Sequence, residues 1–98
     1  MKDKGDGKFR ALRIRVAGRV QGVWFRANTL KTAQDLRLDG WVRNMPDGAV
    51  EIHVQGDDNS VSRLLSWCYK GPSGARVDKV DYSEADEDAS LRGFFIRY

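Results

Sequence analysis

The chain has 98 residues, 41% of them hydrophobic and 32% charged, and a formal net charge of +3 at pH 7. This length fits one domain with a single core, and the sequence holds no apolar run long enough to cross a membrane. The only cysteine, Cys68, cannot form a disulfide within the chain, which favours a reducing compartment such as the cytoplasm.

The two ends of the chain differ in composition. Residues 1–8 alternate lysine, aspartate and glycine and lack the apolar stretch of a signal peptide. We therefore expect a disordered tail over residues 1–8 and one folded domain over residues 9–98. Basic residues are concentrated in residues 2–26, whereas acidic residues dominate residues 78–88. This segregation favours a small anion as the ligand over a long polyanion.

The first element is a predicted strand over residues 12–16, where apolar and basic residues alternate. A turn bounded by two glycines follows at residues 18–22. Apolar residues at three-residue spacing then predict a helix over about residues 24–37; they are Ala27, Leu30, Ala33 and Leu36.

A hairpin is predicted next. Strand patterns at residues 41–44 and 49–55 flank the sequence Met45-Pro46-Asp47-Gly48, and an Asp-Gly pair between two strands is a strong hairpin signal. In the second of these strands the side chains alternate between the two faces. We expect Val50, Ile52 and Val54 to face the core and Glu51, His53 and Gln55 to face the other side of the sheet, with His53 exposed to solvent.

A second helix and two strands complete the chain. The helix is indicated by Val61, Leu64, Leu65 and Cys68, which recur at helical spacing after a capping-type run at residues 57–60 and before Gly71-Pro72. A strand at residues 76–84 shifts phase between Val77 and Val80, as a β-bulge requires. Phe94, Ile96 and Tyr98 alternate in a last short strand.

This order of elements predicts an α+β fold, the ferredoxin-like two-layer sandwich. Its pattern is βαββαβ plus a short C-terminal strand, with an antiparallel sheet and two helices on one face. In this topology the first and second strands end at the same edge of the sheet. Functional residues are therefore expected at that edge.

The segment Gly18-Arg19-Val20-Gln21-Gly22-Val23-Trp24-Phe25-Arg26 lies at this edge and runs into the first helix. Two glycines allow successive backbone N–H groups to converge, and a helix N-terminus adds unpaired donors, so a phosphate would fit. The positive charge of Arg26 in the first turn opposes the helix dipole, and this placement is explained if a bound dianion outweighs that small penalty. From the glycine spacing alone, an ordinary turn with exposed arginines is the favoured interpretation.

Asn44 ends the second strand at the same edge, where a β-branched or aromatic residue would be usual. Its carboxamide could serve the site, or it could open the hairpin as a turn residue. Taken alone, the turn residue is the simpler interpretation.

The segments GRVQGVWFR and GWVRNMPDGAVE resemble the two signature segments of the acylphosphatase family, in the right order and separation. GPSGARVDKV also resembles the family, and the resemblance extends from about residue 9 to the C-terminus. It implies a ferredoxin-like fold and hydrolysis of acyl phosphates to carboxylate and inorganic phosphate. It also implies that neither a metal nor a cofactor is needed.

The resemblance assigns roles to particular residues. It implies that Arg26 holds the phosphoryl group together with the backbone amides of Gln21, Gly22, Val23, Trp24 and Phe25. It further implies that Asn44 orients the attacking water. An acyl phosphate expels a carboxylate and needs no general acid, and Asn44 cannot act as a base. We therefore expect the water to lose its proton to a phosphate oxygen of the substrate.

Two further positions concern the end of the first helix and the last residue of the chain. Arg37 stands where the family often has a glycine closing the first helix, so this helix end needs another cap. Tyr98 could bring the terminal carboxylate to Arg26 and orient the guanidinium, or the terminus could be frayed.

Other candidate residues are expected to have structural rather than functional roles. His53 has no second ligand at metal-binding spacing, and Cys68 lies on an apolar helical stripe, as a core residue would. The acidic residues 84–88 lack the spacing of a calcium loop. Phe25 is expected in the core, whereas Trp24 could pack there or line the mouth of the site.

Two other functions compete with hydrolysis. An RNA-binding module would need exposed aromatics on the first and third strands, where the chain has Arg13, Arg15, Glu51 and His53. A regulatory phosphate-binding domain, or the acylphosphatase-like part of a larger maturation enzyme, would keep the cradle without catalysis. We expect a monomer whose partners are a small acyl phosphate and inorganic phosphate, with no nucleic acid or membrane partner.

Overall fold

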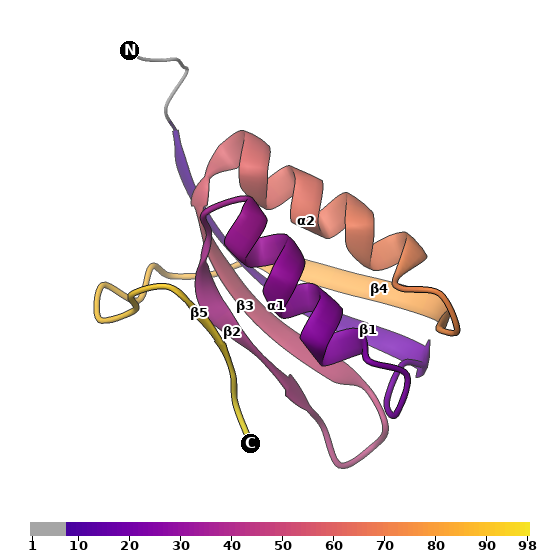
Figure 1. Ribbon diagram of the computed structural model, residues 1–98. Helices are drawn as coiled ribbons and strands as arrows, with labels where there is room; N and C mark the ends of the chain where they lie inside the picture. The colour runs from indigo at the N-terminus through magenta and orange to yellow at the C-terminus, as the bar shows by residue number, and fades with distance from the viewer. Residues whose placement is uncertain (1–7) are drawn as a thin grey trace.

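Two helices cover one face of a five-stranded sheet in the computed structural model, which describes residues 8–98 (Figure 1). Of the tail predicted at residues 1–8, only Lys8 belongs to the described residues, and its carbonyl oxygen accepts a hydrogen bond of 2.8 Å from Asp58 N. The elements are β1 (Phe9–Arg19), α1 (Phe25–Asp35), β2 (Asp39–Asn44), β3 (Val50–Asp57), α2 (Asp58–Lys70), β4 (Arg76–Glu84) and β5 (Phe94–Ile96).

The sheet has the strand order β4-β1-β3-β2-β5. The three pairs among β1, β2, β3 and β4 are antiparallel, so the predicted ferredoxin-like sandwich is confirmed. The prediction of an antiparallel sheet is wrong for β5, which pairs in parallel with β2 and makes the sheet mixed. The reason is the connection after β4, which crosses the helix-free face and delivers β5 to the opposite edge in the direction of β2.

The core lies between the sheet and the two helices. It includes the inward side chains of the first predicted strand and of β3, as their alternation predicted. Phe25 and Cys68 contribute from α1 and α2, and both are assigned correctly to the core by the sequence. Neither helix of the described residues has the length and apolar character needed to cross a membrane.

The helix ends follow their sequence signals. Asp57 caps α2 by accepting a hydrogen bond of 3.3 Å from Ser60 N. After α1, Arg37 adopts the left-handed backbone conformation with φ +58°, and its N–H donates to Gln34 O at 3.0 Å. The chain thus closes α1 in the way a glycine would, but with an arginine in the conformation that glycine adopts most easily.

A β-bulge shapes the edge of the sheet where β1 ends. Ala17 pairs with Lys79 and Gly18 with Val77, so Asp78 is the extra residue, as the phase shift predicted. A Cβ atom at Gly18 would lie 2.2 Å from Arg76 O. Glycine is therefore required here for the close approach of the two strands just before the chain turns toward α1.

His53 and Gln55 correct the sequence prediction. They lie on the helix-free face, as their alternation predicts, but they are only 3% and 2% exposed, so the prediction that His53 faces solvent is wrong. Gln55 Nε2 donates to Asp88 O and Gln55 Oε1 accepts from Asp88 N, both at 2.9 Å, and His53 Nε2 lies 3.0 Å from the same Oε1. The loop before β5 covers them, which a strand's alternation alone does not reveal.

Candidate active site

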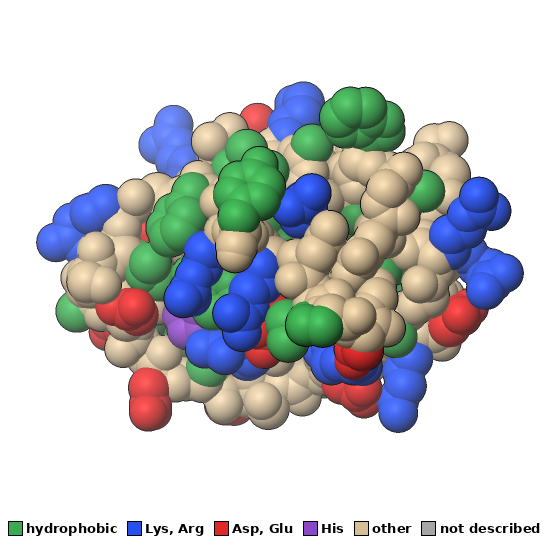
Figure 2. All heavy atoms as spheres, turned by 90° about the horizontal axis from the view of Figure 1, so that it is seen from below, with side chains coloured by type: hydrophobic (Ala, Val, Ile, Leu, Met, Phe, Trp, Pro, Cys, Tyr) green, Lys and Arg blue, Asp and Glu red, His purple; other side chains and the backbone are tan. Residues whose placement is uncertain are grey.

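Three segments that are distant in sequence meet at one edge of the sheet. They are the loop between β1 and α1, the end of β2, and the C-terminal residues after β5, all at the lower end of Figure 1. Viewed from that end, basic side chains gather across the middle of the surface with large hydrophobic groups beside them (Figure 2). The edge predicted from the topology is therefore where polar and apolar side chains converge.

The loop before α1 forms the backbone part of the site. Gly22 has φ +74° and Trp24 has φ +64°, and α1 begins immediately afterwards at Phe25. No side chain caps this helix N-terminus, and no acidic residue lies in its first turn. The first backbone N–H groups of α1 therefore have neither an intrahelical acceptor nor a nearby carboxylate, which makes them available to an anion.

Trp24 combines strain with exposure. A left-handed conformation costs a residue other than glycine about 1–3 kcal/mol. The side chain is also 77% exposed, so it forgoes most of the roughly 1.5–3 kcal/mol that burying a large apolar side chain contributes. Of the two alternatives that the sequence left open for Trp24, core packing is excluded.

A pocket of about 280 Å³ lies between this loop and the end of β2. Its lining includes Gly22, Trp24, Phe25, Arg26 and Asn44, so the structure brings together most of the predicted site residues. The predicted residues Gln21 and Val23 lie in the same loop but do not line the pocket.

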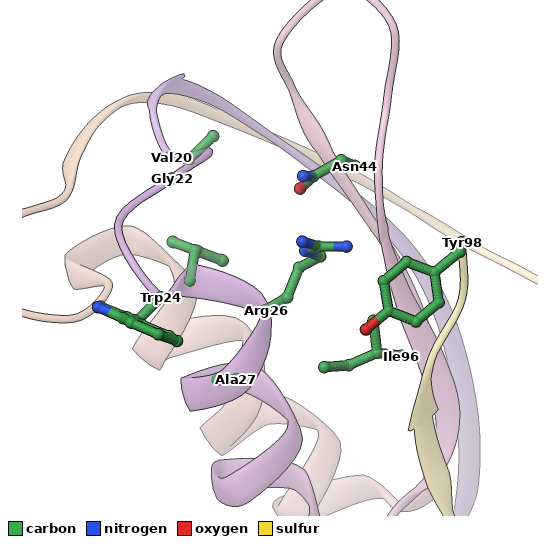
Figure 3. Close-up of a pocket in the computed structure, with 9 residues that line it drawn as sticks. Val20, Gly22, Trp24, Arg26, Ala27, Asn44, Ile96 and Tyr98 are labelled. Atoms are coloured by element: carbon green, nitrogen blue, oxygen red, sulfur yellow. The ribbon is translucent and has the colours of Figure 1, made fainter.

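Arg26 and Asn44 point toward one another across the pocket (Figure 3). Arg26 comes from the first turn of α1 and Asn44 from the last position of β2. The Oδ1 atom of Asn44 is buried and has no hydrogen-bond partner among residues 8–98. A buried oxygen without a partner is costly to leave unpaired, so this carboxamide is set up to bind something the protein itself does not supply.

Gln21 has a role that the sequence did not indicate. Its side-chain amide donates to Met45 O at 2.8 Å and to Ala49 O at 2.9 Å. These bonds tie the loop before α1 to the hairpin that follows Asn44. The side chain thereby fixes the distance between the backbone donors and Asn44, whereas from the sequence only the backbone amide of Gln21 is expected to take part in the site.

The C-terminal residue reaches Arg26 through its ring. The Arg26 guanidinium carbon lies 5.3 Å from the centroid of the Tyr98 ring, within the range of a cation–π contact. The ion pairs of residues 8–98 include none between Arg26 and the terminal carboxylate. Tyr98 is 97% exposed, so this contact lies at the surface of the protein.

Cys68 and the acidic residues lie outside this site. Burial raises the pKa of the Cys68 thiol to about 12, which keeps it protonated at neutral pH and unsuited to act as a nucleophile. Within residues 8–98, no three His, Cys, Asp or Glu side chains lie close enough together to hold a metal ion.

The helix-free face carries a covered tryptophan. Trp41 is 5% exposed, and the guanidinium groups of Arg13, Arg43 and Arg97 lie 4.7–5.2 Å from its ring. Two of these arginines also pair with Glu51. The indole is therefore covered by arginine side chains and offers no free face on which an RNA base could stack.

Comparison with known proteins agrees with the geometry. The acylphosphatase family profile matches residues 12–96. An acylphosphatase of Rubrobacter xylanophilus is 45% identical over 88% of this chain and 78% of its own length, and one of Thiobacillus denitrificans is 48% identical over 83% and 91%. The structure of an acylphosphatase from Coxiella burnetii is 37% identical and superposes with a TM-score of 0.85 over 99% of this chain and 100% of that one. The chain therefore belongs to the acylphosphatase family, whose members are hydrolases that act on acid anhydrides.

Proposed function

We propose that the protein hydrolyses acyl phosphates to a carboxylate and inorganic phosphate, with Arg26 and Asn44 as the catalytic side chains. The observation that carries this proposal is the unpartnered Asn44 Oδ1, buried in the pocket into which Arg26 points. Membership of the acylphosphatase family supports the same reaction.

The phosphate end of the substrate binds to the loop before α1. The backbone N–H groups of residues 21–25 and the Arg26 guanidinium donate to its oxygens, and the helix dipole favours its negative charge. The transferred phosphoryl group spreads its charge over three oxygens in the transition state. Donors fixed in place before the reaction therefore stabilise that charge without having to reorganise.

Asn44 orients the attacking water. Its Oδ1 accepts a hydrogen bond from the water and holds the oxygen in line with the bond that breaks. A neutral amide cannot take the proton, so the proton passes to a phosphate oxygen of the substrate. The water oxygen forms a bond to phosphorus as the bond to the acyl oxygen breaks. The acyl group leaves as a carboxylate and requires no general acid.

Release of phosphate from benzoyl phosphate, measured in the presence of a chelator, tests the proposal. The wild-type protein should be active without added metal. Asn44→Ala should lower kcat by about 10²–10³, the usual effect of removing one group that orients or stabilises the transition state, while inorganic phosphate still inhibits. Arg26→Ala should lower kcat at least as much and should also weaken inhibition by phosphate.

Matched controls separate these effects from general damage. Asn59→Ala and Arg63→Ala change exposed residues of the same types on α2, and both variants should keep full activity. Full activity of Asn44→Ala or Arg26→Ala would contradict the assigned roles. A wild-type protein that binds phosphate but hydrolyses no acyl phosphate would instead favour a regulatory phosphate-binding domain.

We further propose that the protein works as a monomer in the cytoplasm. The buried Cys68 supports a reducing compartment, because the chain needs no disulfide for stability. Size-exclusion chromatography with light scattering tests the oligomeric state, and a mass of twice the chain would contradict it.

A further inference from the structure

The side chains that line about half of the pocket are apolar, and these side chains have no part in holding the phosphate. Arg26, Asn44 and the backbone at Gly22 form its polar side. The remaining lining is hydrophobic: Val20, Trp24, Phe25, Ala27, Ile96 and Tyr98. The volume is about 280 Å³, whereas a cavity needs only about 10–15 Å³ to hold one water molecule, so the pocket is larger than one phosphate group fills. Room therefore remains for the part of the substrate beyond the phosphate.

Two exposed aromatic rings stand at the mouth of this pocket. Trp24 and Tyr98 lie on opposite sides of Arg26 (Figure 3). The Tyr98 ring already contacts the guanidinium, at 5.3 Å from its centroid. The Trp24 indole is 77% exposed. Within the described residues the Trp24 ring makes no aromatic or cation–π contact, so of the two rings it is the one left uncommitted for an incoming group to cover.

The backbone at Trp24 is strained. Trp24 has φ +64°, in the left-handed region that large side chains avoid. Strain of this kind persists at functional sites, where the surrounding structure holds it in place. The left-handed backbone belongs to the cradle before α1, and it carries a large, exposed indole at the mouth of the pocket, although the cradle itself needs only the backbone of this residue.

We propose that Trp24 is a specificity-determining residue and that the preferred substrates are acyl phosphates with an aromatic or bulky apolar acyl group. This inference rests on the hydrolysis proposed above. With the phosphate fixed by the backbone donors and Arg26, the acyl group extends toward the mouth of the pocket. There it packs against the indole, and an aromatic acyl group gains more from this contact than its buried area alone provides.

The ratio of kcat/KM for benzoyl phosphate to kcat/KM for acetyl phosphate tests the inference. Both substrates place the same phosphate in the cradle and differ only in the acyl group. In Trp24→Ala this ratio should fall about tenfold, a difference of about 1.4 kcal/mol between the two transition states. Trp24→Phe keeps an aromatic wall, so its ratio should stay within about threefold of the wild-type value. Tyr69→Ala, which removes an exposed ring from α2, should leave the ratio unchanged.

The outcomes separate this inference from the proposed function. Equal loss of activity toward both substrates in Trp24→Ala would mean that only the cradle was disturbed. That result would overturn the inference about Trp24 but would not contradict the proposed hydrolysis of acyl phosphates. Failure of the wild-type protein to hydrolyse either substrate would overturn the proposed function itself.

A binding measurement tests the same contact without catalysis. Trp24 is far more exposed than Trp41, at 77% against 5%, and Trp67 is only partly exposed, so acrylamide should quench mainly the Trp24 fluorescence. Saturating phenylphosphonate should reduce this quenching, inorganic phosphate should reduce it less, and Trp24→Phe should lack the difference. Equal protection by both ligands in the wild-type protein would overturn the inference.

Discussion

Gln21 illustrates how a single side chain positions the site without touching the substrate. Its amide bonds to Met45 O and Ala49 O join the loop before α1 to the hairpin after β2. Both carbonyls also accept backbone hydrogen bonds, from Gly48 N and Met45 N respectively. Removing the side-chain amide therefore leaves neither carbonyl entirely unpaired. The main loss is the fixed spacing between the cradle and Asn44.

We predict that Gln21→Met lowers kcat about tenfold and changes phosphate inhibition much less. In the mechanism proposed above, the phosphate donors belong to the loop itself, whereas the position of the water that Asn44 would orient depends on the tether. Two ordinary hydrogen bonds together contribute about 1–3 kcal/mol, so the free energy of unfolding should fall by no more than that. The measurements are kcat, KM and the inhibition constant of inorganic phosphate.

Gln34, on the neighbouring helix α1, provides the control for Gln21→Met. Gln34→Met replaces an exposed glutamine of α1 and should change none of the three constants. If Gln21→Met behaved like Gln34→Met, the tether would have no positioning role.

At the scale of single elements, the end of α1 is closed by a residue other than glycine in the left-handed conformation. Arg37 occupies a left-handed position with φ +58°, and the helix is closed by hydrogen bonds from Arg37 N to Gln34 O and from Leu38 N to Ala33 O. The helix end thus has the geometry that a glycine would adopt there. The cost of having arginine in its place is the backbone strain of this one residue. Arg37 lies at the opposite end of α1 from the candidate active site.

Replacing Arg37 by glycine should stabilise the protein. Relief of the left-handed conformation contributes about 1–2 kcal/mol, and the greater entropy of glycine in the unfolded chain offsets part of this. We expect the free energy of unfolding to rise by about 0.5–1 kcal/mol in urea denaturation, with kcat and KM unchanged. Arg37→Ala, which retains the strain, should show no such gain. A loss of stability in Arg37→Gly would mean that the arginine side chain makes a more important contact than the backbone suggests.

At the scale of the whole molecule, two carboxylates fasten the connections around the sheet. Asp47 closes the hairpin by accepting from Ala49 N at 3.0 Å and by pairing with Arg15. Asp88 orders the loop over His53 by accepting from Ser90 Oγ and Ser90 N at 2.6 and 3.0 Å. The hydrogen bond from Ala49 N, followed by that from Arg15, lowers the pKa of Asp47, and the two bonds from Ser90 lower the pKa of Asp88.

These shifts predict a loss of stability in acid. Because both pKa values are lower in the folded protein, the unfolded chain binds more protons below the ordinary Asp pKa of about 3.9. The stabilisation is therefore complete above that pH and is lost as the pH falls through the folded-state pKa values. Urea denaturation between pH 2 and pH 7 measures this. Asp47→Ala and Asp88→Ala should each be less stable than wild type at neutral pH and should approach it at pH 2; a constant difference across this range would contradict the prediction.

The sequence by itself determined the elements and their order along the chain, the bulge at β4 and the edge where the site lies. These features follow from local patterns: the alternation of Leu12, Ile14 and Val16, the Asp-Gly turn, and the glycines around residues 18–22. The resemblance to a family, carried by two short segments, indicated Arg26 and Asn44. All of this information is contained within stretches of about ten residues.

Only the tertiary structure decided which distant segments touch. The burial of His53 and Gln55 depends on a loop more than thirty residues later in the chain, and the parallel pairing of β5 depends on the path of that same loop. The tether from Gln21 to the hairpin and the contact of the Tyr98 ring with Arg26 likewise join segments that share no local pattern. Periodicity reports which face a side chain takes within its own element, whereas what covers that face is determined by how the whole chain packs.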